Sequence, residues 1–297
     1  MTFSIVAIDR ENNEVGFAIA SCTWDAGMVG TAKAEVGAIC SQALGYFKFH
    51  SMLYERLAKK MTMAEILEDF KKDDMNIENR QIGMISFEGA PLSFTGAKCG
   101  HWAGHKIGEN YACQGNILTG PEVIEKMAEA FEKSEGMLAE RLYAALQAGD
   151  DIGGDIRGKI SARVLVKKKG YGLEDTYIDF TIEDHDEPVR EIGRLLAVRR
   201  KIFGAYLRQM SVVEAEGGAK VIALESMEEY LSDKIDKTVV DYHSFVGDTS
   251  LELGFQDMAI AAYRRVLSIS PNLVRYFETQ KQSGKMPADV VDAILKP

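Results

Sequence analysis

Thr2 is the residue whose type and position most directly suggest chemistry. It follows only Met1 and opens the apolar segment of residues 3–8. A threonine hydroxyl is a weak nucleophile unless a neighbouring base accepts its proton. If Met1 is removed, Thr2 carries a free α-amine beside its own Oγ1, and an α-amine titrates near neutral pH. Thr2 is therefore a candidate nucleophile that brings its own general base, although threonine is also simply common after an initiator methionine.

Lys33 is a second candidate, because it is the only basic residue between Arg10 and Lys48. Its neighbours are small or apolar. A buried lysine would have a lowered pKa and would need a carboxylate or hydroxyl partner. The alternative, which the segment alone favours, is a lysine at a strand end that holds its ammonium group in water.

Two histidines, His101 and His105, are four residues apart, which is a metal-binding spacing on a helix. Gly100, Gly104 and Gly108 make a helix there improbable. We therefore expect a loop that shapes a pocket and no metal or other cofactor, with a metal hydrolase as an alternative. The four cysteines show no C-x-x-C spacing, so reduced thiols are expected and a catalytic cysteine is a minor alternative.

Composition excludes several classes of protein. The 297 residues carry a formal net charge of −10 and have a pI of about 5.2. Nucleic-acid and anionic-membrane surfaces need a basic footprint, so neither partner is expected. No apolar run approaches the roughly 18–20 residues of a membrane span, and the N-terminus lacks the basic and apolar regions of a signal peptide. We expect a cytoplasmic protein.

The elements that must position these residues follow from periodicity and turn signals. Strands, helix pairs and strands succeed one another, which does not match the alternation of a parallel sheet. The order favours antiparallel sheets covered by helices on both sides, a four-layer α+β sandwich. Strands are expected at residues 2–9, 15–22, 31–35, 36–43, 81–87, 92–96, 110–115, 159–167 and 175–182, and helices at 45–60, 62–72, 121–134, 138–147 and 188–208.

Five separated motifs carry a resemblance to a known family. They are the opening segment 2–7, the run 36–43, the block 96–105, the segment 114–121 and the Gly-rich stretch 153–162. On these motifs, which cover roughly residues 2–200, the chain resembles the N-terminal-nucleophile (Ntn) hydrolases. More narrowly, it resembles the family catalogued as domain of unknown function 1028. The resemblance implies the αββα Ntn-hydrolase sandwich, with two stacked antiparallel sheets between helix layers.

The resemblance also implies roles for individual residues. Lys33 occupies the place of the lysine that lies beside the nucleophile in proteasome-like Ntn hydrolases. Those enzymes often carry an aspartate at the end of the second strand, where this chain has Ser21, Cys22 and Thr23. Asp155 or Ser161 would then orient the α-amine.

On this hypothesis, Thr2 attacks a small amide or peptide substrate, and an acyl-ester intermediate is hydrolysed. Oxyanion donors are expected from a backbone N–H near Ser41 and Gln42, or from Gln114 or Asn116. For every residue of this pocket, a purely structural hydrogen-bonding role is an equal alternative. The remaining expected pocket residues are His101, Trp102, His105, Asn110 and Arg157.

The chain is expected to have three regions. Residues 1–209 form the Ntn-like domain, residues 210–237 form a linker, and residues 238–297 form a small all-α extension. Within the linker we expect a short strand at 220–224 and a helix at 226–235. Residues 239–272 resemble a single tetratricopeptide repeat. One repeat cannot bury its own face, so a structural cap or a contact in a homodimer or higher homo-oligomer is favoured over a peptide groove.

Two functions remain open from the sequence. The first is an Ntn-type amidohydrolase that requires removal of Met1. The alternative is a catalytically inactive Ntn-fold protein that binds a ligand or acts as a scaffold.

Overall fold

The structure is a computed structural model that describes residues 2–296. It divides into two compact units, one ending at Leu196 and the other beginning at Ala197, whereas the sequence prediction places the first boundary after residue 209. Among residues 2–296, no helix is both long enough and apolar enough to cross a membrane.

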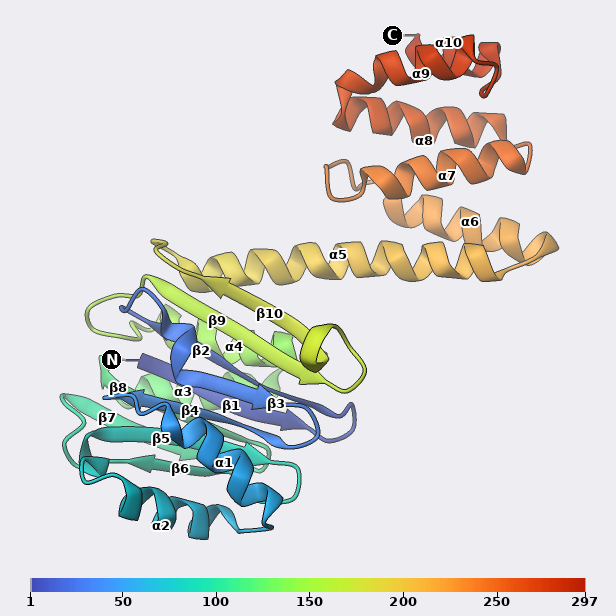
Figure 1. Cartoon of the computed structure of the whole chain (residues 1–297). Helices are drawn as coiled ribbons and strands as arrows, with labels where there is room; N and C mark the ends of the chain where they lie inside the picture. The colour runs from blue at the N-terminus through green and yellow to red at the C-terminus, as the bar shows by residue number, and fades with distance from the viewer. Residues whose placement is uncertain (1, 297) are drawn as a thin grey trace. The chain divides into compact units, whose positions relative to one another are not determined.

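The first unit contains two antiparallel sheets (Figure 1). The six-stranded sheet has the order β10-β9-β2-β1-β8-β7, and the four-stranded sheet has the order β3-β4-β5-β6. The strands are β1 (Thr2–Asp9), β2 (Glu14–Ser21), β3 (Gly30–Lys33), β4 (Gly37–Ala43), β5 (Arg80–Ser86), β6 (Leu92–Thr95), β7 (Trp102–Ile107), β8 (Tyr111–Leu118), β9 (Ser161–Lys168) and β10 (Thr176–Ile182).

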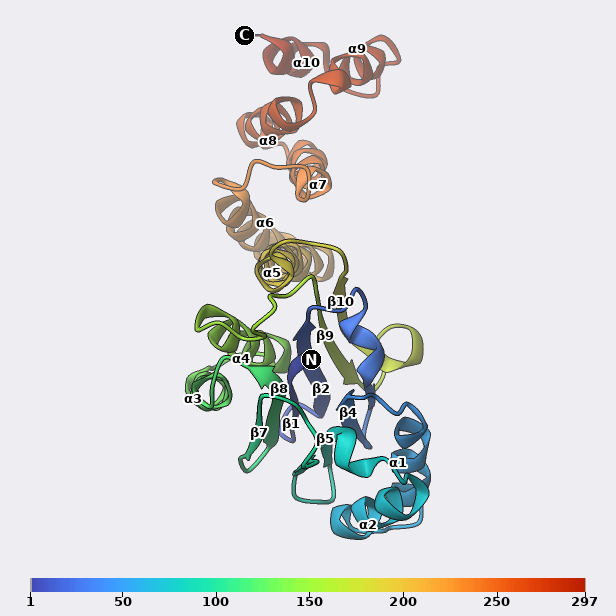
Figure 2. The same ribbon diagram turned by 90° about the vertical axis from the view of Figure 1, so that its left-hand side faces the viewer.

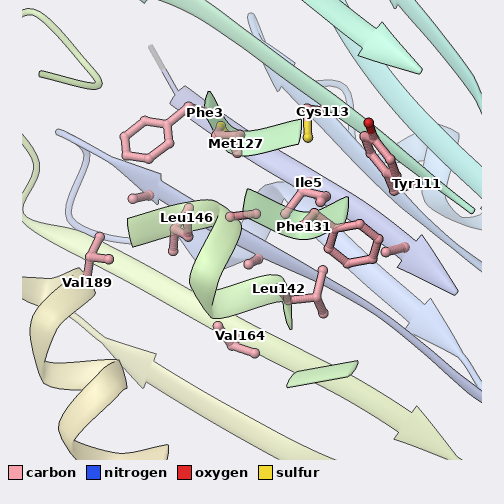
Figure 3. Close-up of a cluster of buried hydrophobic side chains, with 14 of the residues drawn as sticks. Phe3, Ile5, Tyr111, Cys113, Met127, Phe131, Leu142, Leu146, Val164 and Val189 are labelled. Atoms are coloured by element: carbon pink, nitrogen blue, oxygen red, sulfur yellow. The ribbon is translucent and has the colours of Figure 1, made fainter. Parts of the chain in front are cut away.

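Helices cover the outer face of each sheet, with α3 (Glu122–Lys133) and α4 (Leu138–Asp151) on the six-stranded sheet and α1 (Lys48–Ala58) and α2 (Met63–Asp73) on the other (Figure 2). Strand β1 is buried on both faces, which is why its sequence lacks polar alternation. Its odd-numbered residues, such as Phe3 and Ile5, pack against α3 and α4 (Figure 3). Its even-numbered residues Val6 and Ile8 pack between the two sheets.

The second unit is helical and has two apolar clusters of its own. Helices α7 and α8 pack closely, because Gly247 leaves room for the ring of Tyr263. The helices are α5 (Pro188–Glu214), which begins in the first unit, α6 (Gly217–Leu231), α7 (Val240–Glu252), α8 (Gln256–Ile269), α9 (Val274–Gln282) and α10 (Ala288–Leu295).

Two local predictions were wrong. The expected pocket loop around residues 99–106 is in large part strand β7, an edge strand that pairs with β8. The expected strand at residues 220–224 lies inside helix α6, whose buried residues Leu224, Met227 and Leu231 join the core of the second unit. The short apolar run there fits a helix face as well as a strand.

Candidate functional site

Thr2 is the first residue of β1, where it pairs with Ser21 of β2 on one side and Asn116 of β8 on the other. Only 5% of its surface is exposed. Its Oγ1 donates a hydrogen bond to Ser21 Oγ at 3.3 Å. Because side chains alternate along a strand, Thr2 shares a face with Val6 and points toward the four-stranded sheet. Thr2 thus lies at one end of the space between the sheets.

Hydroxyl groups from β2 and β9 surround this position. The Thr23 backbone N–H and Thr23 Oγ1 each donate to Ser21 Oγ at 3.3 Å. Ser161 Oγ donates to the carbonyl of Thr23 at 2.6 Å and accepts from the N–H of Ala26 at 2.9 Å. The expected residue Ser161 therefore holds the segment after β2 in place next to Thr2.

Asp155 also reaches this end of the six-stranded sheet. It forms an isolated β-bridge with Leu118, two residues beyond Asn116, the partner of Thr2. Its side chain is fully buried and accepts hydrogen bonds from Arg157, at 2.9 Å from the backbone N–H and 3.3 Å from Nη2. The structure thus brings Asp155 and Arg157 to the strand end on which Thr2 lies, and the Arg157 side chain remains 45% exposed.

Cys22 is the thiol of this region. Burial raises its pKa, and the neighbouring Asp155 carboxylate raises it further. A thiol in this environment stays protonated near neutral pH, so it is a poor nucleophile. Thr2, which carries its own α-amine once Met1 is removed, is the candidate nucleophile at this strand end.

A buried amide network joins the two sheets directly beneath Thr2. Gln42 Nε2 donates to the Thr2 carbonyl at 3.3 Å and to Gln81 Oε1 at 2.9 Å. Gln114 Nε2 donates to Ser4 Oγ at 2.6 Å, and Ser4 Oγ donates to Gln42 Oε1 at 2.7 Å. The Gln114 side chain also fills the space beside Gly83, where a Cβ would lie 2.0 Å from Gln114 Oε1.

These bonds occupy the side-chain amides that were expected as oxyanion donors. Gln42 and Gln114 have no exposed surface, and Asn116 Nδ2 donates to Gln81 Oε1 at 2.9 Å. Ser41 Oγ is paired with the backbone of Tyr46. In the observed arrangement these side-chain amides donate to one another, to Ser4 and to the Thr2 carbonyl.

Two expected site residues lie at the opposite end of the sandwich. Lys33 pairs with Gly37, which pairs with Ser86 of β5. Arg10, the residue after β1, donates to the Ser86 carbonyl and also to Asn110 Oδ1. Lys33 and Asn110 are therefore separated from Thr2 by the length of β1, about 24 Å for an eight-residue strand. Neither takes part in the arrangement around Thr2.

The histidine block lies on and before the edge strand β7. Trp102 pairs with Leu118, and His105 Nδ1 is 2.8 Å from Thr95 Oγ1. Burial lowers the pKa of His105. His101 is exposed, just before the strand. Four residues of extended chain span about 13 Å, so the two histidines do not form the pair that a helix would give. Residues 2–296 contain no cluster of three or more potential metal ligands.

Exposed apolar side chains gather around the end of the sandwich where Thr2 lies. They belong to the segments that follow β2 and β4 and precede β9. Their exposed fractions range from 37% to 64%. The residues are Trp24, Met28, Leu44, Phe47, Ile152, Ile156 and Ile160. We refer to these seven residues as the apolar rim.

Sequence reasoning missed Ser4 and Gln81 as parts of this region, and it named Ser21 and Thr23 only as a departure from the aspartate that the resemblance implies. The signal for Ser21 is register: a two-stranded hairpin of equal strands places the last residue of β2 opposite the first residue of β1. No local pattern marks Gln81, because its partners come from β4, β7 and β8, which are distant in sequence.

Comparisons with known proteins agree on one family. Residues 2–192 match the model of a family described as "Family of unknown function (DUF1028)". The chain is similar to the crystal structure of protein SPO2555 from Silicibacter pomeroyi, which is described with the same family model. The two are 25% identical with a TM-score of 0.60, over 66% of this chain and 88% of that one. No curated protein matches the chain. The protein belongs to the DUF1028 family.

Proposed function

We propose that this protein is an N-terminal-nucleophile amidohydrolase that cleaves a small amide or peptide bond with Thr2 after removal of Met1. The observation that carries the proposal is the position of Thr2. It opens a central strand at the end of two stacked sheets and is hydrogen-bonded to Ser21. Two stacked antiparallel sheets between helix layers also form the arrangement expected of Ntn hydrolases.

The proposed reaction has two steps. Thr2 Oγ1 adds to the carbonyl carbon while its α-amine accepts the hydroxyl proton, and the same proton is passed to the departing amine as the C–N bond breaks. Water then adds to the acyl ester, with the amine again accepting a proton, and Thr2 Oγ1 leaves with that proton. Each turnover consumes one water and one amide and releases an acid and an amine.

Asp155 and Ser161 are the residues that we propose to orient the amine end of Thr2. Asp155 forms a β-bridge with Leu118, two residues after Asn116, which pairs with Thr2. It supplies a buried carboxylate at this strand end. Ser161 fixes the segment containing Thr23, which contacts Ser21. Lys33 has no part in this scheme, because it lies at the other end of β1. Backbone N–H groups supply the oxyanion donors, since the nearby side-chain amides are occupied.

The apolar rim narrows the proposed substrate to an amide that carries an apolar group. Trp24, Leu44 and Phe47 are exposed by 64%, 56% and 45% at the Thr2 end of the sandwich. Burying such surfaces against a ligand contributes about 25 cal/mol for each Å². Arg157, half exposed, could receive a carboxylate on the same substrate.

The tail and the assembly form a second part of the proposal. We infer that the helical region from residue 238 is a tetratricopeptide-like cap that supports a homodimer or a higher homo-oligomer. The close contact of Gly247 with Tyr263 and the buried Ala259 and Ala262 fit a helical-repeat pair. Light scattering of the full-length protein would show a mass of two or more chains.

The test is hydrolysis by protein from which Met1 has been removed, checked by intact mass. A panel of N-acyl amides with short and long apolar acyl groups is incubated with wild type, Thr2→Ala and Thr2→Ser. We expect hydrolysis by wild type, a loss of at least about 10³-fold in Thr2→Ala, and partial activity in Thr2→Ser, which keeps a hydroxyl nucleophile. Equal rates for wild type and Thr2→Ala would contradict the proposal.

A second candidate is a catalytically inactive protein that binds a ligand at the same place. Two observations favour it: the neighbouring amide donors are saturated, and no lysine stands beside Thr2 in the described arrangement. It predicts that Met1-free wild type binds apolar amides but leaves them intact.

A further inference from the structure

We propose that the first unit has a second ligand site, at the end of the sandwich opposite Thr2, that binds a short zwitterionic peptide. Two adjoining depressions of about 390 and 230 Å³ lie there. They share Leu57, Lys60, Ser86 and Glu88, so they form one continuous groove between helix α1 and the turn after β5. Small-ligand pockets typically have volumes of about 300–1,000 Å³.

The charged side chains of the groove indicate a ligand that carries both a positive and a negative charge. Lys33 and Lys60 contribute ammonium groups, and Glu35 and Glu88 contribute carboxylates. Among residues 2–296, none of these four side chains takes part in an ion pair or a side-chain hydrogen bond, although the chain pairs many other charges. Two cations and two anions that face one groove without pairing suit a ligand with an ammonium at one end and a carboxylate at the other.

The backbone conformation of Glu35 and Lys60 supports a functional role for their side chains in the groove. Glu35 has φ 60° and Lys60 has φ 59°, in the left-handed region where glycine is the favoured residue. Lys60 follows α1 at a helix end closed by the bonds Lys60 N–H to Leu57 O and Met61 N–H to Arg56 O, where glycine is the usual residue. Both strained positions carry a charged side chain, and both side chains line the same groove. Backbone strain of this kind is commonly retained at functional sites.

The groove also offers apolar and neutral polar contacts. The larger depression is lined by Met61, Met63, Pro91 and Leu92, which suit an apolar side chain. The smaller one is lined by Tyr54, whose buried hydroxyl lies next to Thr31. The occupant we infer is therefore a di- or tripeptide with free ends and an apolar side chain.

The test uses leucyl-leucine as the probe and the full-length protein, with binding followed by calorimetric titration. We expect leucyl-leucine to bind, and both its N-acetyl form and its C-terminal amide to bind at least tenfold more weakly. No binding at millimolar concentration, or equal binding of a blocked form, would overturn the proposal.

Lys60→Gly separates ligand binding from folding. Glycine suits the left-handed backbone at this position, so we expect an unchanged or raised melting temperature together with at least a tenfold loss of affinity. Lys59→Ala removes the adjacent lysine, which does not line the groove, and should leave affinity unchanged. Thr2→Ala should also bind the probe normally, because this site does not depend on the proposed catalytic function. Full affinity in Lys60→Gly would contradict the assignment.

Discussion

At the scale of single residues, Thr2 depends on side chains that never touch solvent. Its carbonyl accepts from Gln42, and Gln42 in turn donates to Gln81. Gln81 Nε2 donates to the Gly115 carbonyl at 2.7 Å and to the Gly104 carbonyl at 3.0 Å. A fully paired buried network of this kind fixes one arrangement of its members, because each unpaired group would be costly. The position of Thr2 is therefore set by the contact between the sheets.

Gln81→Ala tests this support. The change leaves the partners of Gln81 in β4, β7 and β8 without their bonds, and we expect it to destabilise the first unit by about 3 kcal/mol. Urea unfolding followed by tryptophan fluorescence measures the effect, because Trp24 and Trp102 both lie before Leu196. Gln256→Ala lies at an exposed position of α8. It should change the free energy of this unfolding transition by less than about 0.5 kcal/mol. A similarly small effect of Gln81→Ala would show that the network is dispensable.

At the scale of elements, an ion pair joins β5 to the end of α2. Arg80 Nε donates to Asp74 Oδ2 at 2.7 Å, and both side chains are less than 10% exposed. Burial by itself would raise the pKa of Asp74, but hydrogen bonds from Arg80 and from the N–H of Asn76 outweigh it and lower the pKa below its ordinary value. Arg80 also donates to the carbonyl of Leu44, so the pair holds the segment between β4 and α1.

Asp74→Asn should therefore have a pH-dependent effect. A carboxyl whose pKa is lowered on folding stabilises the protein above its unfolded pKa of about 3.9, and this stability is lost as the pH falls through the lower folded pKa. We expect the free energy of unfolding of wild type to exceed that of Asp74→Asn by about 3 kcal/mol at pH 7. Urea unfolding at a series of pH values should show this difference shrinking below about pH 4. Asp73→Asn, which breaks a more exposed pair with Lys48, should cost less than about 1 kcal/mol. A difference that persists unchanged in acid would contradict the assignment to ionised Asp74.

The elements themselves were largely predictable from the sequence. The buried strands and the paired helices of the first unit were expected close to their observed bounds, because apolar periodicity and the capping box at Thr62 are local signals. Strand β7 was missed because it is an edge strand whose residues are half-buried or exposed, so it lacks a strong apolar pattern. The position of Lys33 could not be read locally, since it depends on the path of the Gly-rich segment before β3 and on how the two sheets face each other.

At the scale of the whole molecule, the first unit has two ends with different chemistry. One end combines Thr2, neighbouring hydroxyl groups and a rim of exposed apolar side chains. The other end carries the groove with unpaired charges of both signs. The family match covers residues 2–192 and therefore includes both ends, while the helical unit, which begins at Ala197, lies beyond it. The sequence predicted the first end through Thr2, whereas it singled out Lys33 of the groove for a different role, beside the nucleophile.

Covalent labelling of Thr2 tests the central claim most directly. Protein whose Met1 has been removed is treated with an electrophilic lactone that bears an apolar side chain, and the modified residue is located by peptide mass spectrometry. The account predicts one added acyl group on Thr2, absent in Thr2→Ala and absent in protein that retains Met1. Met1-free protein that stays unlabelled, or that is labelled equally in Thr2→Ala, would contradict it.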